Sequence, residues 1–264
     1  MTVVVLLILA VLLILSVQAA RRKRLRLLVL YILLILPCAM LFYFSVYYRA
    51  GEEARRALPD REAVPISFAA SARFFDGPGE DTALIFYPGA KVEAAAYAPL
   101  LSKIAAGGVD CFLVEMPLHF AFLGVNAADQ IIETHRFDRW ILAGHSLGGV
   151  AASSYAAAHT DAVAGIVLLA SYPAGEQGSM PFLSIYGDRD TVLNRESYEK
   201  SRAFWPKDAE ELVIPGGNHA QFGDYGPQRG DGEAVITPDE QQTQTAQTIL
   251  HWIQTRISEG GKAA

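Results

Sequence analysis

The chain has 264 residues, of which 52% are hydrophobic, and it carries a formal net charge of −6 at pH 7. An acidic balance offers no basic field to a nucleic-acid backbone, so we expect no nucleic-acid partner. The mean hydropathy of +0.22 is high for a soluble domain, and the excess of apolar residues lies before Arg49. The remaining stretch of about 200 residues is long enough for one domain with a sizeable core.

Two apolar stretches, residues 2–20 and 27–48, open the chain. Each is close to the roughly 20 residues that a helix needs to cross the bilayer core. A cleaved signal peptide carries its basic residues before the apolar run, whereas here the basic cluster at 21–26 follows it. We therefore predict a two-helix transmembrane hairpin over residues 1–50, with 21–26 as its turn. Aromatic residues at the end of the second stretch are expected to form an interfacial belt: Phe42, Tyr43, Phe44, Tyr47 and Tyr48.

The basic turn at 21–26 predicts an orientation, because short basic loops stay on the cytoplasmic side of a membrane. The N-terminus and the C-terminal domain would then lie outside the cytoplasm, in a multi-pass protein whose partner is the lipid membrane. The alternative is that the cluster only binds anionic lipid head groups, which puts the turn on the same side. Arg49, Arg55 and Arg56 flank the second stretch on its other side and weaken the asymmetry, although two glutamates partly offset them.

After the hairpin, a charged and helix-prone stretch at 51–62 predicts a juxtamembrane linker, and 63–264 predicts one folded domain. In that domain short apolar runs alternate with helix-like segments. The predicted strands are 64–75 (one or two strands), 83–87, 111–115, 140–143, 163–171, 182–186 and 212–214, and the predicted helices are 92–106, 127–135, 148–159, 196–204 and 238–257. This alternation indicates a mainly parallel α/β sheet with helices on both faces, and a ligand site beyond the carboxyl ends of the strands.

The sequence Gly144-His145-Ser146-Leu147-Gly148 follows one of these strands directly. A G-x-S-x-G pattern alone is weak, but between a strand and a helix it predicts a sharp turn that exposes the serine hydroxyl. The alternative is a plain glycine-rich turn or a phosphate cradle at a helix N-terminus. No G-x-x-x-x-G-K pattern is present, which excludes the commonest nucleotide-binding version. Ser146 is therefore the predicted nucleophile.

A serine hydroxyl needs a neighbouring base to take its proton. His219 is the predicted base, because it follows the strand at 212–214 through a glycine-rich turn. The alternative is a loop histidine without a role. The other histidines fit less well, because they precede the serine, lie on helices or, for the one inside the motif, should point away from the hydroxyl: His119, His135, His145, His159 and His251.

The nucleophile and the base are two members of a catalytic triad, and the third member is an acid. This acid lies between the serine and the histidine in the chain. Asp188 and Asp190 both follow the strand at 182–186, and the residues alone leave the choice open, although Asp188 is suited to bonding the turn itself.

An oxyanion hole needs two backbone N–H donors. Leu147 is one predicted donor. Ala90 is the other, with Lys91 as the alternative, in the loop that follows the strand at 83–87.

Three phrases of the sequence resemble the α/β-hydrolase superfamily, over about Val64 to Ile257, and more narrowly its small, lid-poor bacterial members. The phrases are Phe86-Tyr87-Pro88-Gly89-Ala90, Gly144 to Gly149, and Gly216-Gly217-Asn218-His219-Ala220-Gln221-Phe222-Gly223. The resemblance implies an eight-stranded sheet or a trimmed version of it, and acyl-ester chemistry with no cofactor. Ser146, Asp190 and His219 match the triad positions one by one, so the resemblance favours Asp190. The oxyanion loop departs from the family pattern, because Pro-Gly-Ala replaces the His-Gly-Gly type.

These observations together predict a membrane-anchored, carboxylesterase-like serine hydrolase that cleaves small-molecule esters through an acyl-enzyme on Ser146, without a cofactor or a metal. Thioesterase or dienelactone-type hydrolysis is possible on the same machinery. An alternative of another class is a catalytically inactive, membrane-bound binding protein with this fold.

Two connections lie where they could border the site. The loop at 117–124 contains four large apolar residues, for which two predictions stay open: they line an acyl pocket, or they belong to the core. The segment at 222–236 is long enough to have a functional role. Its Asp224 and Asp231 do not match the spacing of a calcium loop, so we predict solvated turns.

Overall fold

The computed structural model describes residues 2–60, 64–65, 71–79 and 81–258. The chain divides into two compact units, Met1–Tyr47 and Tyr48–Ala264, which are described separately.

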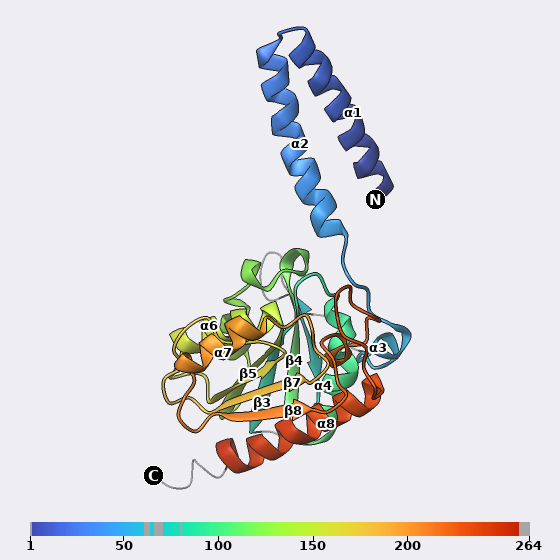
Figure 1. Cartoon of the computed structure of the whole chain (residues 1–264). Helices are drawn as coiled ribbons and strands as arrows, with labels where there is room; N and C mark the ends of the chain where they lie inside the picture. Colours follow the sequence, from blue (N-terminus) through green and yellow to red (C-terminus); the bar gives the residue numbers. More distant parts are fainter. Residues whose placement is uncertain (1, 61–63, 66–70, 80, 259–264) are drawn as a thin grey trace. The chain divides into compact units, whose positions relative to one another are not determined.

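The first unit is a pair of helices, α1 (Thr2–Arg21) and α2 (Leu25–Ser45), which lie side by side (Figure 1). Both are long and apolar enough, by length and composition, to cross a membrane. The turn between them is tighter than the predicted 21–26, since α1 includes Arg21 and α2 already begins at Leu25.

The second helix was predicted to run to residue 48 but ends at Ser45. Tyr48 belongs to the second unit, where its N–H donates to the Lys91 carbonyl over 2.7 Å and its carbonyl accepts from the Glu93 N–H over 2.9 Å. Its ring packs on Tyr225, with the centroids 5.6 Å apart. These contacts place Tyr48 in the second unit rather than in the second helix, and the aromatic belt stays a prediction.

The segment predicted as a juxtamembrane linker is a packed part of the second unit as far as the structure describes it. It contains α3 (Glu52–Arg56), in which Ala54 is fully buried. The Ala54 N–H donates to Asp224 Oδ2 over 2.8 Å, and the Gly51 N–H donates to the Asp224 carbonyl over 2.7 Å. The helix is too short to be stable alone, so these tertiary contacts hold it.

The second unit is built on an eight-stranded sheet in the order β1-β2-β4-β3-β5-β6-β7-β8 (Figure 1). The strands are β1 (Val64–Pro65), β2 (Ser71–Phe75), β3 (Thr82–Tyr87), β4 (Asp110–Glu115), β5 (Arg139–His145), β6 (Gly165–Leu169), β7 (Phe182–Gly187) and β8 (Glu210–Ile214). The pairs β1–β2 and β2–β4 are antiparallel, and the others are parallel. The predicted fold class, a mainly parallel sheet with helices on both faces, is confirmed.

Helices bury both faces of the sheet, which explains why the strands read as continuous apolar runs. Along β3, Leu84 and Phe86 join one core cluster, whereas Ala83, Ile85 and Tyr87 join the other. Residues of α4 (Ala98–Ala106) and α8 (Pro238–Trp252) belong to the first cluster, and residues of α5 (Ala127–Thr134) and α6 (Leu147–Ala158) to the second.

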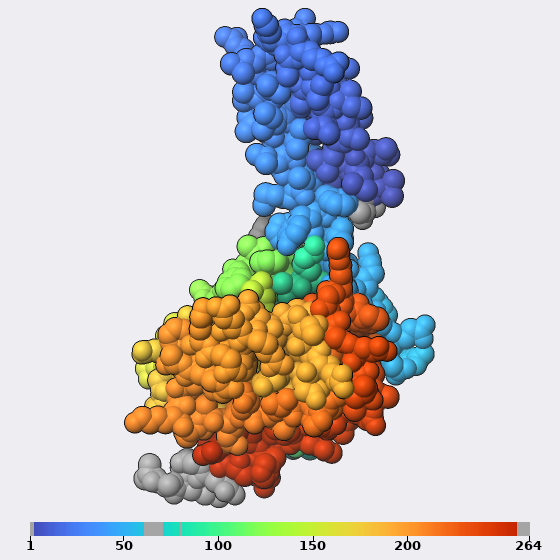
Figure 2. All heavy atoms as spheres, viewed as in Figure 1, coloured from blue at the N-terminus to red at the C-terminus, as the bar shows by residue number. Residues whose placement is uncertain are grey.

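The remaining elements complete the unit. They are α7 (Arg195–Ser201), five 3₁₀ turns (Ala94–Tyr97, Pro117–His119, Ala121–Leu123, Arg202–Phe204 and Ala220–Phe222) and a π-helical end after α8 (Ile253–Ser258). The long final helix begins at a capping box between Thr237 and Glu240, with Pro238 in its first turn. The edge strand β8 alternates between half-buried and exposed positions before the buried Ile214, and it lies with α7 on the face shown in Figure 2.

Candidate active site

The turn between β5 and α6 has the geometry of a nucleophile elbow. Ser146 has φ 51° and ψ −126°, a left-handed conformation that is unfavourable for a residue with a side chain. Two hydrogen bonds from outside α6 hold it: its N–H donates to the Leu169 carbonyl over 2.9 Å, and Ser171 Oγ donates to its carbonyl over 2.6 Å. Ser146 is half-buried in this strained turn.

Close backbone approach explains the two glycines that flank this turn. A Cβ atom on Gly148 would overlap the backbone oxygens of Tyr87 and Pro88 at the end of β3. A Cβ atom on Gly144 would overlap the backbone of Gly148. The motif therefore requires glycine at these positions for packing, independently of any chemistry at the serine.

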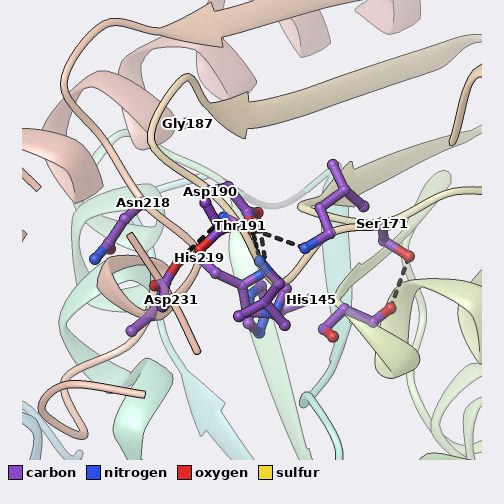
Figure 3. A network of polar contacts seen from close by, with 12 residues as sticks. His145, Ser171, Gly187, Asp190, Thr191, Asn218, His219 and Asp231 are labelled. Atoms are coloured by element: carbon purple, nitrogen blue, oxygen red, sulfur yellow. Dashed lines mark hydrogen bonds and ion pairs between the residues drawn. The ribbon is translucent and has the colours of Figure 1, made fainter. Parts of the chain in front are cut away.

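Asp190 and His219 form a buried pair at the carboxyl ends of β7 and β8 (Figure 3). His219 Nδ1 lies 2.9 Å from Asp190 Oδ2, and the two residues are 1% and 4% exposed. The other carboxylate oxygen of Asp190 accepts the N–H groups of Val192 and Leu193, over 2.9 and 2.8 Å. These three contacts orient the carboxylate toward the imidazole.

Asp188 does not take part in this pair. Its Oδ1 accepts the Gly216 N–H over 2.8 Å, and its side chain is 45% exposed. It therefore closes the turn between the loops that follow β7 and β8, which is the local role expected for it. Of the two aspartates, the structure brings only Asp190 to His219.

The structure does not join the serine to the pair by a hydrogen bond. His219 Nε2 is buried and has no hydrogen-bond partner among the described residues, so no bond to Ser146 Oγ is formed. In ligand-free enzymes such bonds are often long and tighten only when substrate is bound. The roles of Ser146, Asp190 and His219 in catalysis remain predictions.

The backbone N–H groups of the loop after β3 differ in their hydrogen-bond partners. The Lys91 N–H donates to the His119 carbonyl over 2.8 Å, and the Gly89 N–H donates to the Tyr97 hydroxyl over 3.1 Å. For Ala90 and Leu147, the structure shows no hydrogen bond from the backbone N–H to any described residue. Leu147 is the first residue of α6, where the N–H groups of a helix have no partner within it. Ala90 and Leu147 thus stay the candidate oxyanion donors, and the occupied Lys91 N–H disfavours the alternative.

A buried tyrosine links this loop to the elbow. Tyr97 Oη lies 2.8 Å from His145 Nδ1, and it also accepts the Gly89 N–H. Burial raises the pKa of Tyr97 well above its usual value, so the phenol keeps its proton. The Tyr97 hydroxyl therefore bonds both the Gly89 N–H and the His145 ring.

His145 stays uncharged beside the predicted base. Its ring centroid lies 4.5 Å from that of His219 (Figure 3). Burial, and then the charge of His219, hold the pKa of His145 well below its usual value. The sequence did not point to Tyr97, which stands in a run of alanines at 94–98 without any chemical motif.

Asp231 connects two loops of the candidate site. Its Oδ2 accepts the Ala220 N–H over 2.9 Å, and its Oδ1 lies 3.4 Å from the Thr191 N–H (Figure 3). It therefore joins the loop of the predicted acid to the loop of the predicted base. Asp224 accepts from α3 in the same manner, so the prediction of solvated turns was wrong for both aspartates.

The apolar loop after β4 is not part of the core. Leu118, Phe122 and Leu123 are 52%, 46% and 53% exposed. Only Ala121 of this stretch is buried. The core alternative was therefore wrong for these three large side chains. Within the described residues, no group of three or more His, Cys, Asp or Glu side chains is placed to hold a metal ion.

The fold and this arrangement define a protein of the α/β-hydrolase class. Residues 83–243 match the model of the alpha/beta hydrolase family, and the chain belongs to that family. No curated protein matches the sequence.

Solved structures share the fold at low sequence identity. Est1E from Butyrivibrio proteoclasticus has a TM-score of 0.57 and 14% identity, over 74% of this chain and 99% of that one. A soluble variant of monoglyceride lipase from Saccharomyces cerevisiae has a TM-score of 0.58 and 12% identity, over 75% and 96%. Dienelactone hydrolase from Anabaena variabilis has a TM-score of 0.58 and 18% identity, over 74% and 96%.

Proposed function

We propose that the protein is a serine hydrolase that cleaves carboxylic esters through an acyl-enzyme on Ser146. The observation that carries this proposal is the buried Asp190–His219 pair, with its 2.9 Å contact, at the same sheet edge as the strained serine turn. The names of the structural neighbours, which include a monoglyceride lipase and a dienelactone hydrolase, are consistent with hydrolysis.

In the proposed reaction, His219 Nε2 takes the proton of Ser146 Oγ as the oxygen attacks the acyl carbon. Asp190 holds the imidazole in the required tautomer and stabilises the imidazolium that forms. The imidazolium then gives its proton to the leaving alcohol. A water molecule activated by His219 attacks the acyl-enzyme, and the carboxylic acid is released.

The negative oxygen of each tetrahedral intermediate would be held by the backbone N–H groups of Ala90 and Leu147. Such donors, fixed before the reaction, stabilise charge that develops only in the transition state. The Tyr97 hydroxyl fixes the Ala90 loop through the Gly89 N–H, which supports Ala90 as a donor of stable position.

The proposal includes anchoring by α1 and α2 as a transmembrane hairpin, with the basic turn on the cytoplasmic side and the catalytic unit outside the cytoplasm. The length and apolar composition of both helices support the anchoring. A reporter fused to the C-terminus tests the orientation: activity of a reporter that works only in the cytoplasm would overturn it.

A fluorophosphonate probe tests the nucleophile directly in the full-length protein. We expect covalent labelling of the wild type, none of Ser146→Ala, and full labelling of Ser154→Ala. Ser154 is a matched control because it lies on α6 and, among the described residues, its hydroxyl bonds the Val150 carbonyl alone. An unlabelled wild type, or a Ser146→Ala variant labelled as fast as the wild type, would contradict the proposal.

A further inference from the structure

Three large apolar side chains are exposed to solvent in one short loop. Leu118, Phe122 and Leu123 lie in the two 3₁₀ turns after β4, and Figure 2 shows atoms of this stretch at the surface, in light green. In the rest of the described catalytic unit, the exposed large apolar residues lie singly on separate elements: Phe204, Val213 and Val235. Single exposed apolar residues are ordinary, but a gathered group marks an interaction surface.

The backbone of this loop is also strained. Leu118 and His119 are consecutive residues with φ of 52° and 57°, a conformation that residues with a side chain rarely adopt. Such strain persists where the surrounding structure fixes it, and it is common at functional sites. Here the strain coincides with apolar side chains that lie outside the core, which is typical of a loop that contacts a partner.

Two backbone hydrogen bonds connect this loop to the entry of the chain into the catalytic unit. The His119 carbonyl accepts from Lys91, and the Lys91 carbonyl accepts from Tyr48. Tyr48 is the first residue of the unit, and two residues separate it from the end of α2 at Ser45. The chain therefore enters the catalytic unit beside the apolar loop. The candidate oxyanion donor Ala90 is the neighbour of Lys91, so the loop also adjoins the candidate site.

We propose that the 117–123 loop is a lipid-contact surface, whose Leu118, Phe122 and Leu123 insert into the apolar part of a bilayer. The two apolar helices on the same chain, and the entry point beside the loop, favour a lipid surface over a second copy or another protein. The substrate class that follows is an ester with a long acyl chain that resides in the membrane. This inference rests on the proposed anchoring and hydrolase function.

Lipid contact is measured without reference to catalysis, in the full-length protein reconstituted into phosphatidylcholine vesicles. A Cys38→Ser background leaves only the buried Cys111, so Phe122→Cys introduces one accessible thiol for a fluorescent label. Phe204→Cys is the matched control, since Phe204 is also an exposed phenylalanine, 37% exposed, at the end of another 3₁₀ turn.

Acyl chains that carry a nitroxide quench a fluorophore only when it reaches the lipid. We expect at least twofold stronger quenching for the label at residue 122 than for the label at 204. Equal quenching overturns the proposal. The label at residue 122 could instead be protected from a water-soluble quencher, to a degree that rises with protein concentration, and not be quenched by the lipid nitroxide. That result assigns the surface to a second copy of the chain and also overturns the proposal.

Access of substrate from the lipid is tested by replacing Leu118, Phe122 and Leu123 together with serine. The measured quantity is the ratio of activity on a long-chain ester in vesicles to activity on a short, water-soluble nitrophenyl ester. We expect this ratio to fall at least tenfold, and to stay within twofold of the wild type for a Phe204→Ser and Val213→Ser control. An unchanged ratio overturns the access role. If wild-type protein neither reacts with fluorophosphonate nor cleaves either ester, the hydrolase proposal fails, whereas the quenching result still decides lipid contact.

Discussion

Replacing Tyr97 with phenylalanine removes an oxygen atom that joins the loop after β3 to the nucleophile elbow. The Gly89 N–H loses its acceptor at 3.1 Å, and His145 Nδ1 loses its hydrogen-bond partner at 2.8 Å. Both groups are buried and keep no other partner among the described residues. A buried polar group left without a partner costs about 1–3 kcal/mol, so we expect a substantial loss of stability in the variant.

The effect on catalysis follows from Ala90, the neighbour of Gly89. Loss of a complete oxyanion donor lowers kcat by roughly 10²–10³-fold. Tyr97→Phe frees the loop without deleting the Ala90 N–H, so we expect a smaller fall in kcat, of about 10–100-fold by the same reasoning. KM should change little, because the contact stabilises the transition state rather than the bound ester.

The assay is steady-state hydrolysis of a short nitrophenyl ester, measured beside urea unfolding of the same samples. Tyr198→Phe is the control: Tyr198 is also fully buried, and its hydroxyl bonds Ser184 and Glu211 over 2.7 and 2.6 Å, away from the site. It should lose stability but keep its kcat. If the two variants lose stability and kcat in the same proportion, Tyr97 has no positioning role and the reasoning is refuted.

Three further predictions follow from the same geometry. Asp190→Asn should lower kcat for ester hydrolysis by about 10⁴-fold, because the histidine loses the carboxylate that orients it. Asp188→Asn should lower kcat in the same assay less than tenfold. The pKa of His145 is lowered in the native protein, so below pH 6.5 the unfolded chain binds a proton at this residue that the native protein does not. The free energy of unfolding therefore falls as the pH falls below 6.5, by up to about 1.4 kcal/mol per pH unit. His145→Gln should therefore flatten the pH dependence of urea unfolding below pH 6.5, and an unchanged slope would refute the assignment. Gly148→Ala should abolish activity, because the new methyl group overlaps two backbone oxygens, whereas Gly175→Ala, with open space around it, should behave as the wild type.

The alternation of strands and helices was predictable because each buried strand carries its own signal. Both faces of β3 are covered, so every residue from Ala83 to Tyr87 is apolar and the run stands out in the sequence. The elbow at Ser146 and the candidates Asp190 and His219 were found for a related reason: each directly follows such a strand. Position after a strand narrowed the acid to Asp188 and Asp190, and the family resemblance then favoured Asp190.

The residues that were missed depend on partners far away in the chain. Tyr97 Oη meets His145, and Asp231 meets Thr191 and Ala220, through contacts that no local pattern encodes. Tyr48 continues an apolar stretch in sequence, but its backbone pairs with residues 91 and 93, so tertiary structure overrode the helical preference. Local propensity decides an element only where no such competing contact exists.

The position of His219 depends on α8 as much as on β8. A histidine on a glycine-rich turn has few local constraints, yet the proposed role of general base requires it to be held within a fraction of an ångström of its working position. Gln241, fully buried on α8, accepts the Asn218 N–H over 3.0 Å and donates to the Asn218 carbonyl over 2.8 Å. Asp231 accepts the N–H of Ala220, on the other side of His219. The residues on either side of His219 are thus fixed to a helix and to the 222–236 segment, and the contact with Asp190 orients the imidazole ring.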